Sequence, residues 1–155
     1  NPFAKKIEAL NFSSFCYWLR CFPNGTLAIE AQTDKFVYHI GEVITVNCVF
    51  KNWTPTIIEP QVKLMQYIKF SANGKDRTKE LEISYDFIVP TLEPNSVRNF
   101  ISKIDVPKYV DDIPLSATLT NCPLIKVTYC VLVALRKAKL CIPVVLENNY
   151  SRSKS

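Results

Sequence analysis

Residues 121–146, NCPLIKVTYCVLVALRKAKLCIPVVL, form the longest apolar run in the chain, and strand-forming residues rather than helix-forming residues build it. Between residues 124 and 133 one parity, which includes Val127, is apolar or aromatic, whereas the other is polar at Lys126 and Thr128 and apolar after them. A period of two with many β-branched side chains predicts a strand that begins half-exposed and ends buried on both faces. The basic residues at 136–139 predict a turn, and residues 140–146 predict a return strand. We therefore expect a hairpin at the centre of its sheet.

Five other segments alternate in the same way, and turn-forming residues separate them. Asn73-Gly74 is the strongest hairpin signal, because both residues tolerate the positive φ angles of a type I′ turn. No segment shows an amphipathic helical period over three turns. Short strands with turns between them predict an all-β fold, an immunoglobulin-like β-sandwich of about seven to eight antiparallel strands. The five segments are residues 26–33, 42–51, 61–70, 79–89 and 97–106.

Two of these segments predict which side chains face the core. Between residues 61 and 70, the expected core positions continue to the end of the segment and include Leu64, Ile68 and Phe70. Between residues 79 and 89, apolar positions alternate as far as Phe87, so the return strand is expected to continue to Val89.

The length of 155 residues is that of one domain, which buries about two-thirds of the surface that its unfolded chain exposes. The hydrophobic fraction of 48% predicts a globular protein. No run of about 18 uncharged apolar residues is present, so no membrane-spanning helix is predicted. Residues 1–14 lack the basic-then-apolar order of a signal peptide, so we expect either a cytosolic protein or a sequence that starts inside a longer protein.

Six cysteines and four N-x-S/T sequons leave an alternative open, a secreted or cell-surface immunoglobulin-like binding domain with disulfide bonds. That class carries a cysteine pair between its sheets, for which Cys48 and Cys130 are the candidates. However, three of the cysteines lie in strand-like apolar runs, where a reduced cysteine acts as a small hydrophobic residue. A reduced protein is therefore favoured. The cysteines are Cys16, Cys21, Cys48, Cys122, Cys130 and Cys141, and the sequons begin at Asn11, Asn24, Asn52 and Asn149.

Residue types that carry catalysis are few in this chain. His39 is the single histidine and lies beside an expected turn, so neither nucleophilic catalysis nor a histidine-containing zinc site has support. Three glycines leave no glycine-rich phosphate loop. The basic residues are too sparse for nucleic-acid binding and lack interleaved aromatic residues. We expect no enzyme, no metal, no cofactor and no nucleic-acid partner.

The net charge of +5 includes two clusters of basic residues beside expected hairpin turns. Either cluster suits contacts with anions, such as phosphorylated peptide tails or acidic lipid headgroups. The plainer interpretation is that charged hairpin ends keep edge strands from pairing with other chains. The candidate binding residues are Lys75, Arg77 and Lys79 in one cluster and Arg136, Lys137 and Lys139 in the other.

Several motifs follow one another in a consistent order, beginning with YHIGEVI at residues 38–44 and then Asn52. This first motif resembles the "Y-x-P-G-E-x-I … N" opening of the arrestin C-terminal domain. Gln66 and the ANGK of residues 72–75 resemble its "Q-x-x-x-F-x-A-x-G-K" hairpin. Residues 121–146 are similar to its "C-x-I-I-x-V-x-Y-x-L" strand and its closing "L-P-I-x-I".

The preceding segment is similar to one subfamily. Cys16 and Cys21, followed by Gly25, resemble the approach to this domain in alpha-arrestins, the arrestin-domain-containing proteins. The resemblance covers about residues 15–146. The chain departs from the pattern before Cys122, where the usual proline-rich loop is altered, and it lacks the P-x-Y motifs of alpha-arrestin tails. Ligase recruitment is therefore not carried over to this chain.

The resemblance implies a non-enzymatic adaptor that binds cytoplasmic parts of membrane proteins. Such an adaptor links these proteins to endocytosis, protein transport or ubiquitination machinery, and anionic lipid headgroups are a further expected contact. Its expected location is cytoplasmic, peripherally associated with the plasma membrane or endosomes. The implied organisation is a linker from a preceding N-terminal arrestin lobe in residues 1–22, an arrestin C-terminal-like domain in residues 23–148 and a flexible tail in residues 149–155.

Overall fold

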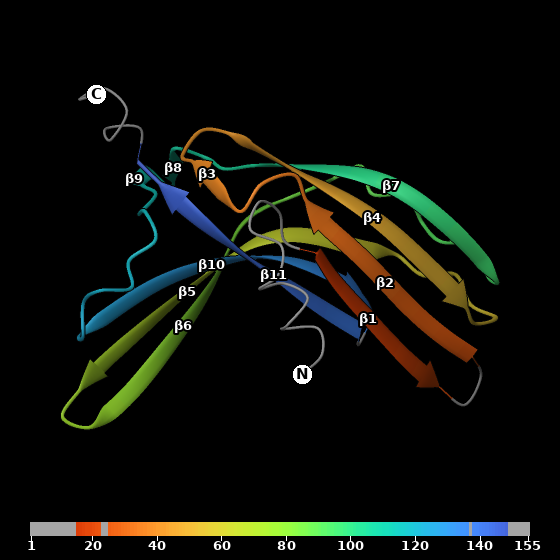
Figure 1. Ribbon diagram of the computed structural model, residues 1–155, viewed down its shortest axis with the longest axis horizontal. Helices are drawn as coiled ribbons and strands as arrows, with labels where there is room; N and C mark the ends of the chain where they lie inside the picture. The colour runs from red at the N-terminus through yellow and green to blue at the C-terminus, as the bar shows by residue number, and fades with distance from the viewer. Residues whose placement is uncertain (1–14, 23–24, 137, 149–155) are drawn as a thin grey trace.

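A computed structural model describes residues 15–22, 25–136 and 138–148, with the backbone alone for residues 15–22. The helix and strand elements of these described residues are all β-strands. They form two facing sheets and a separate two-stranded sheet (Figure 1). The predicted all-β sandwich is confirmed. In spatial order the four-stranded sheet holds β1 (Phe15–Phe22), β2 (Gly25–Thr33), β4 (Val43–Trp53) and β7 (Ser96–Asp105). The five-stranded sheet holds β3 (Val37–His39), β11 (Ala138–Glu147), β10 (Ile125–Leu135), β5 (Pro60–Ala72) and β6 (Lys75–Tyr85), and β8 (Tyr109–Val110) pairs with β9 (Ile113–Pro114).

Strand number and direction depart from the expected fold in two respects. Seven of the eleven strands in the described residues correspond to the alternating segments, and β1, the short β3 and the small β8–β9 pair are additional. The short β3 pairs with β11 in parallel, whereas the other strand pairs of the described chain are antiparallel. The chain crosses from β2 in one sheet to β3 in the other, and this crossing leaves β3 running in the same direction as β11.

Strand β1 lies within the segment that the sequence assigns to a linker. Its eight residues pair with β2 in antiparallel register from Phe15↔Gln32 to Phe22↔Gly25. This end of the segment is therefore an edge strand of the four-stranded sheet. The remainder of residues 1–22 and the tail at residues 149–155 lie outside the described residues, and a preceding lobe stays a prediction.

The core lies between the two sheets. Ile29 and Phe50 on the four-stranded sheet and Val131 and Ile142 on the five-stranded sheet all have 0% exposed surface. Each such side chain stabilises the fold by about 1.5–3 kcal/mol relative to an exposed position. The predicted central hairpin is confirmed, because β10 is the third of five strands and is mostly buried on both faces after Thr128.

The prediction for residues 61–70 is correct only for the first half of β5. Val62 and Leu64 are buried, Ile68 is half-buried, and Phe70 is 41% exposed. Figure 1 shows the reason. The β5–β6 hairpin extends away from the four-stranded sheet, so that this sheet no longer lies over the end of the hairpin. An apolar side chain on the core side of a strand is buried only where a second layer lies over it.

The prediction that the return strand continues to Val89 is wrong. Strand β6 ends at Tyr85, and the side chain of Phe87 is 80% exposed. The pairing of β5 with β6 shifts between Leu64 and Met65, so that one extra residue, Ile83, lies on the β6 side. Such a bulge bends the strand and ends regular pairing. The alternation in the sequence therefore continues beyond the strand that it predicts.

Candidate functional site

The end of the β5–β6 hairpin, residues 68–79, is named the arm. Its turn is formed by Asn73 and Gly74, whose φ angles of 53° and 72° are the positive pair expected for a type I′ turn. A Cβ atom added at Gly74 would meet no atom within 4 Å, so the turn lies in open space. The predicted Asn73-Gly74 hairpin is confirmed, and it carries the first basic cluster away from the body of the sandwich (Figure 1).

Lys75, Arg77 and Lys79 are exposed and occupy alternate positions of β6, so they share one face of the arm. Lys79 lies opposite Ile68 of β5, and Ile68 lies opposite Val127 of β10, which is buried in the core. The three cations therefore project from the core side of the five-stranded sheet, here named the inner face, just beyond the point where the core ends.

The acidic residues of β6 occupy the opposite, outer face. The Asp76 carboxylate lies 3.3 Å from the Lys69 amine and accepts a 2.7 Å hydrogen bond from the Ser71 hydroxyl. The Ser71 hydrogen bond, and then Lys69, hold the pKa of Asp76 below its usual value. Glu82 pairs with Lys63 at 3.4 Å. By contrast, the inner-face positions of β5, β6, β10 and β11 include no aspartate or glutamate, so no carboxylate from these strands neutralises the inner-face cations.

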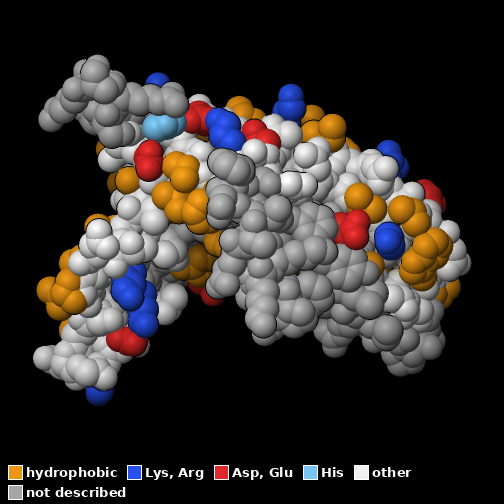
Figure 2. Space-filling model, viewed as in Figure 1, with side chains coloured by type: hydrophobic (Ala, Val, Ile, Leu, Met, Phe, Trp, Pro, Cys, Tyr) orange, Lys and Arg blue, Asp and Glu red, His pale blue; other side chains and the backbone are white. Residues whose placement is uncertain are grey.

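Apolar side chains lie among the cations of the inner face. Phe70 is 41% exposed and lies between Arg77 on β6 and Ile125 on β10, and Leu81 is 40% exposed two positions after Lys79. Figure 2 shows basic, acidic and hydrophobic side chains together at the arm end of the molecule. Strand β6 is also an edge strand, since in the described chain its far side pairs with no other strand. The surface thus combines cations, apolar contacts and unpaired backbone groups.

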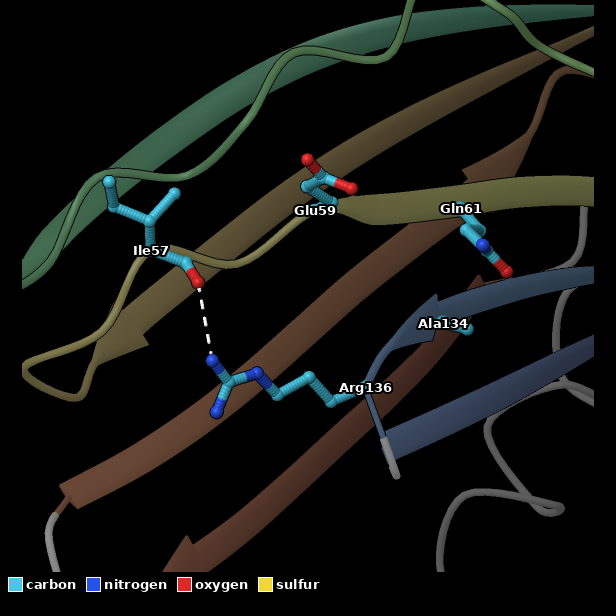
Figure 3. Close-up of a pocket in the computed structure, with 5 residues that line it drawn as sticks. All are labelled: Ile57, Glu59, Gln61, Ala134 and Arg136. Carbon is cyan, nitrogen blue, oxygen red and sulfur yellow. Dashed lines mark hydrogen bonds between the residues drawn. The ribbon is translucent and has the colours of Figure 1, made fainter.

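The second basic cluster is divided by the structure. Arg136 lies in the β10–β11 turn with a φ of 55°, and its Nη2 donates a 3.3 Å hydrogen bond to the carbonyl oxygen of Ile57 (Figure 3). Arg136 lines a pocket of about 560 Å³ together with Glu59, whose carboxylate gives the pocket mixed charge (Figure 3). Lys139 is exposed on the outer face of β11, and Lys137 lies outside the described residues.

The two basic clusters lie at opposite ends of the five-stranded sheet. Strand β10 begins with Ile125 opposite Phe70, beside the arm, and ends with Leu135 opposite Pro60, beside Arg136. At about 3.3 Å per residue this strand separates the clusters by roughly 33 Å. The structure therefore does not bring the six candidate residues together, and of the two clusters only the one on the arm forms a continuous cationic face.

The separation of charge on β6 has a signal in the sequence. Residues 75–82 read KDRTKELE, in which the basic residues have odd numbers and the acidic residues have even numbers. Once the Asn73-Gly74 turn sets the register, the two charge types must occupy opposite faces. Whether the cationic face is open depends on where the other sheet ends, which the alternation does not report.

Groups that could carry metal or acid–base chemistry are sparse in the described chain. No three residues of the His, Cys, Asp and Glu types lie close enough to hold a metal ion in the residues that the structure describes. His39 is the last residue of β3, where its backbone N–H donates a 2.9 Å hydrogen bond to Glu42. The position is the strand end that the sequence predicts for this histidine.

The cysteine pair of the disulfide-bonded alternative is not formed. Cys48 faces the core at 2% exposure, and burial raises the pKa of its thiol to about 12. Cys130 lies on the outer face of the five-stranded sheet, where its thiol is 3.5 Å from the hydroxyl of Tyr67. Neither cysteine belongs to a disulfide, and their side chains point in directions that do not meet.

The Asn52 sequon is also inaccessible in the folded domain. Asn52 has 0% exposed surface, and its amide donates hydrogen bonds of 2.9 and 3.1 Å to the carbonyl oxygens of Thr56 and Glu93. Glycosylation attaches a bulky group to an exposed asparagine. This sequon therefore gives no support to the secreted alternative.

The fold and the arm together define a β-sandwich domain with an open, basic surface. Residues 23–149 match the protein family described as Arrestin (or S-antigen), C-terminal domain, and the chain therefore belongs to the arrestin family through this domain. No curated protein matched the chain. The match is to arrestin C-terminal domains in general, and the alpha-arrestin subtype stays a prediction.

Membership of this family supports an adaptor role in general. Arrestin-family domains are generally non-enzymatic and act by binding other proteins. In the part of the chain that the structure describes, no helix has the length and apolarity needed to cross a membrane. The specific partners belong to the proposal that follows.

Proposed function

We propose that this chain is the C-terminal lobe of a cytoplasmic arrestin-like adaptor, whose arm binds acidic or phosphorylated segments in the tails of membrane proteins. In this proposal the adaptor connects its cargo to endocytosis, protein transport or ubiquitination machinery. The observation that carries the proposal is the separation of charge on β6. Lys75, Arg77 and Lys79 share an inner face without carboxylates, whereas Asp76 and Glu82 pair with lysines on the outer face.

A peptide segment fits this surface better than a lipid headgroup does. Strand β6 is an edge strand, so its unpaired backbone groups suit an extended peptide that adds to the sheet. In an extended peptide alternate side chains face the same way, which matches the alternate spacing of the cations. Phe70 and Leu81 add apolar contacts beside those cations, and each is about 40% exposed.

The affinity expected from this surface is modest and depends on salt. Arg77 offers two parallel N–H donors to a phosphate or carboxylate, which is the stronger kind of charged hydrogen bond. Each exposed ion pair contributes only about 0.2–1 kcal/mol and is screened over about 8–10 Å at physiological ionic strength. Three such pairs with apolar contacts suit a reversible adaptor.

The test is fluorescence anisotropy with a labelled peptide that contains alternating phosphoserine and leucine. The variant K75Q/R77Q/K79Q is compared with K51Q/R98Q/K103Q, which removes the same charge from the four-stranded sheet. We expect the arm variant to bind at least tenfold more weakly and the control to bind like the wild type. Equal losses in both variants would show that net charge alone attracts the peptide, and would reject the arm.

A second measurement separates peptides from membranes. Sedimentation with vesicles that contain anionic lipids uses the same two variants and the same salt. The proposal predicts weak vesicle binding that the arm variant leaves unchanged. Tight vesicle binding that the arm variant abolishes, without any peptide binding, would assign the cations to lipid headgroups instead.

A further inference from the structure

We infer that Cys141 and Cys130, on the outer face of the five-stranded sheet, form an oxidisable thiol pair that a peroxide converts into a cross-strand disulfide. The site is on the opposite face of the sheet from the inner face of the arm, and the inference does not depend on the proposed adaptor function. Cys141 is the exposed thiol of the pair and Cys130 is the buried one.

The register of β10 and β11 places the two cysteines next to each other. Cys130 lies opposite Pro143, and Cys141 lies opposite Leu132, so the cysteines are diagonal neighbours on one face. Because proline has no N–H, the Cys130↔Pro143 pair cannot be a hydrogen-bonded pair of the ladder. Hydrogen-bonded and non-hydrogen-bonded pairs alternate along an antiparallel ladder, so Cys141↔Leu132, two positions along, is also a non-hydrogen-bonded pair. In such pairs the side chains lie closer together than in hydrogen-bonded pairs.

The surroundings of the pair assign different roles to its two thiols. A hydrogen bond from Cys130, together with one from Tyr67 and the nearby charge of Lys139, holds the pKa of the Cys141 thiol below its usual value. Partial burial and the charge of Glu80 oppose this effect and are outweighed. The contact with Cys141 and burial raise the pKa of Cys130. Cys141 is therefore the thiolate that reacts, and Cys130 is the protonated thiol that stabilises it.

The chemistry needs one co-reactant, a hydroperoxide. The Cys141 thiolate attacks one peroxide oxygen, the O–O bond breaks, and sulfenic acid and hydroxide form. Cys130 loses its proton and attacks the Cys141 sulfur, which forms the S–S bond and releases the sulfenic oxygen as water. Two thiols and one hydrogen peroxide thus give one disulfide and two waters, with the cysteine sulfurs oxidised and the peroxide reduced.

Geometry indicates that this disulfide is readily reduced again. Diagonal neighbours have Cα atoms about 7–8 Å apart, whereas disulfides usually join Cα atoms at most about 6.8 Å apart. The two strands must therefore approach each other by about 1 Å when the bond forms. A disulfide formed under such a constraint has a higher reduction potential than a structural one, so mild thiol reductants should reverse it.

The experiment treats the reduced, full chain with hydrogen peroxide and then alkylates the remaining thiols before peptide mapping by mass spectrometry. We expect a Cys130–Cys141 crosslink that forms before Cys48 or Cys122 reacts and that dithiothreitol removes. In the C130S variant, Cys141 sulfenic acid should accumulate and be trapped by dimedone. In the C141S variant, the crosslink and the dimedone adduct at this site should both be absent.

Two outcomes would overturn the inference. One is oxidation of Cys141 to sulfinic acid in the wild type without a bond to Cys130, which would show that Cys130 cannot reach the sulfenic sulfur. The other is reaction of Cys122 at a rate equal to or above that of Cys141. Circular dichroism of each serine variant confirms that it folds, so that a lost crosslink reports chemistry rather than unfolding.

Discussion

Gln66 on β5 and Tyr129 on β10 lie opposite each other, and the Gln66 amide donates a 2.8 Å hydrogen bond to the Tyr129 hydroxyl. That hydroxyl in turn donates a 2.5 Å hydrogen bond to the carbonyl oxygen of Ser116. Both side chains are buried, at 6% and 2% exposure. Gln66 lies one inner-face position before Ile68, at the base of the arm. The two hydrogen bonds join β5 and β10 to the loop that contains Ser116.

Removal of the Tyr129 hydroxyl should destabilise the domain. In Tyr129→Phe the buried amide of Gln66 loses its acceptor and the Ser116 carbonyl loses its donor. An unsatisfied buried group costs about 1–3 kcal/mol, and we expect a loss of this size in urea unfolding monitored by fluorescence. The control Tyr109→Phe changes a side chain that is 63% exposed and should stay within about 0.5 kcal/mol of the wild type.

A double variant tests whether the hydrogen bond is the cause. Replacement of both partners in Gln66→Leu with Tyr129→Phe leaves one carbonyl unsatisfied but no buried amide. The double variant should therefore lose less stability than the sum of the two single variants. A strictly additive result would mean that packing of the ring, and not the hydrogen bond, accounts for the loss.

Gly25 at the start of β2 should not tolerate a side chain. Its φ is 151°, and a Cβ atom built there would lie 1.9 Å from the carbonyl oxygen of Trp53. Because the obstacle is backbone of the paired strand β4, Gly25→Ala should displace this end of β2 and lower the unfolding temperature by clearly more than Gly74→Ala does. The matched control is Gly74→Ala, which meets no atom within 4 Å and has only the cost of its positive φ, about 1–2 kcal/mol. Equal losses would contradict the clash.

Asn52 should be among the most sensitive polar positions of the described chain. The side-chain oxygen Oδ1 of Asn52 accepts hydrogen bonds from the Thr54 backbone N–H at 3.1 Å and the Thr54 hydroxyl at 2.6 Å. The side-chain amide nitrogen of Asn52 donates to the backbone carbonyl oxygens of Thr56 and Glu93. Asn52→Ala leaves several buried groups without partners and should cost at least about 2 kcal/mol in urea unfolding. Asn99→Ala, at an exposed position of β7, is the control, and an equal loss there would count against the network.

The ion pair of Lys35 and Glu42 should make a small, pH-dependent contribution. Their side chains lie 2.5 Å apart, and the hydrogen bond from Lys35, with a further bond from the His39 N–H, holds the pKa of Glu42 below its usual value. A carboxyl whose pKa is lowered by folding stabilises the protein above its unfolded pKa of about 4.3, and that stabilisation is lost as the pH falls through the lower folded pKa.

We therefore expect Glu42→Gln to be less stable than the wild type at pH 7 by less than about 1 kcal/mol, because Lys35 is half-exposed. The difference should shrink as the pH falls below about 4. Urea unfolding across this range measures it, with Glu59→Gln as the control, since Glu59 joins no ion pair in the described part of the chain. A difference that grows on acidification would contradict the sign of the pKa shift.

Local pattern was sufficient for seven of the strands, although not for the end of β6, and for the two hairpins. Between residues 42 and 51, every position that the alternation predicts as inward is buried. The Asn73-Gly74 turn follows from backbone sterics at two residues, so it does not depend on distant contacts. Gln66 and Tyr129 both belong to the arrestin-like motifs of the sequence. The hydrogen bond between their side chains gives a structural reason for the presence of these two residues in the motifs.

The structure alone decided how far the second sheet covers the first. The alternation that buries Leu64 also places Phe70 on the inner face, and nothing in either residue reports that the four-stranded sheet ends between them. The same long-range packing leaves Lys75, Arg77 and Lys79 exposed beside Phe70, and places the other basic cluster at the far end of β10. A side chain's face is set by its immediate neighbours in the strand, whereas its burial is set by residues distant in sequence. For that reason the sequence determined most of the strands and the charge pattern of this arrestin-family domain, and tertiary packing determined which of its surfaces is open.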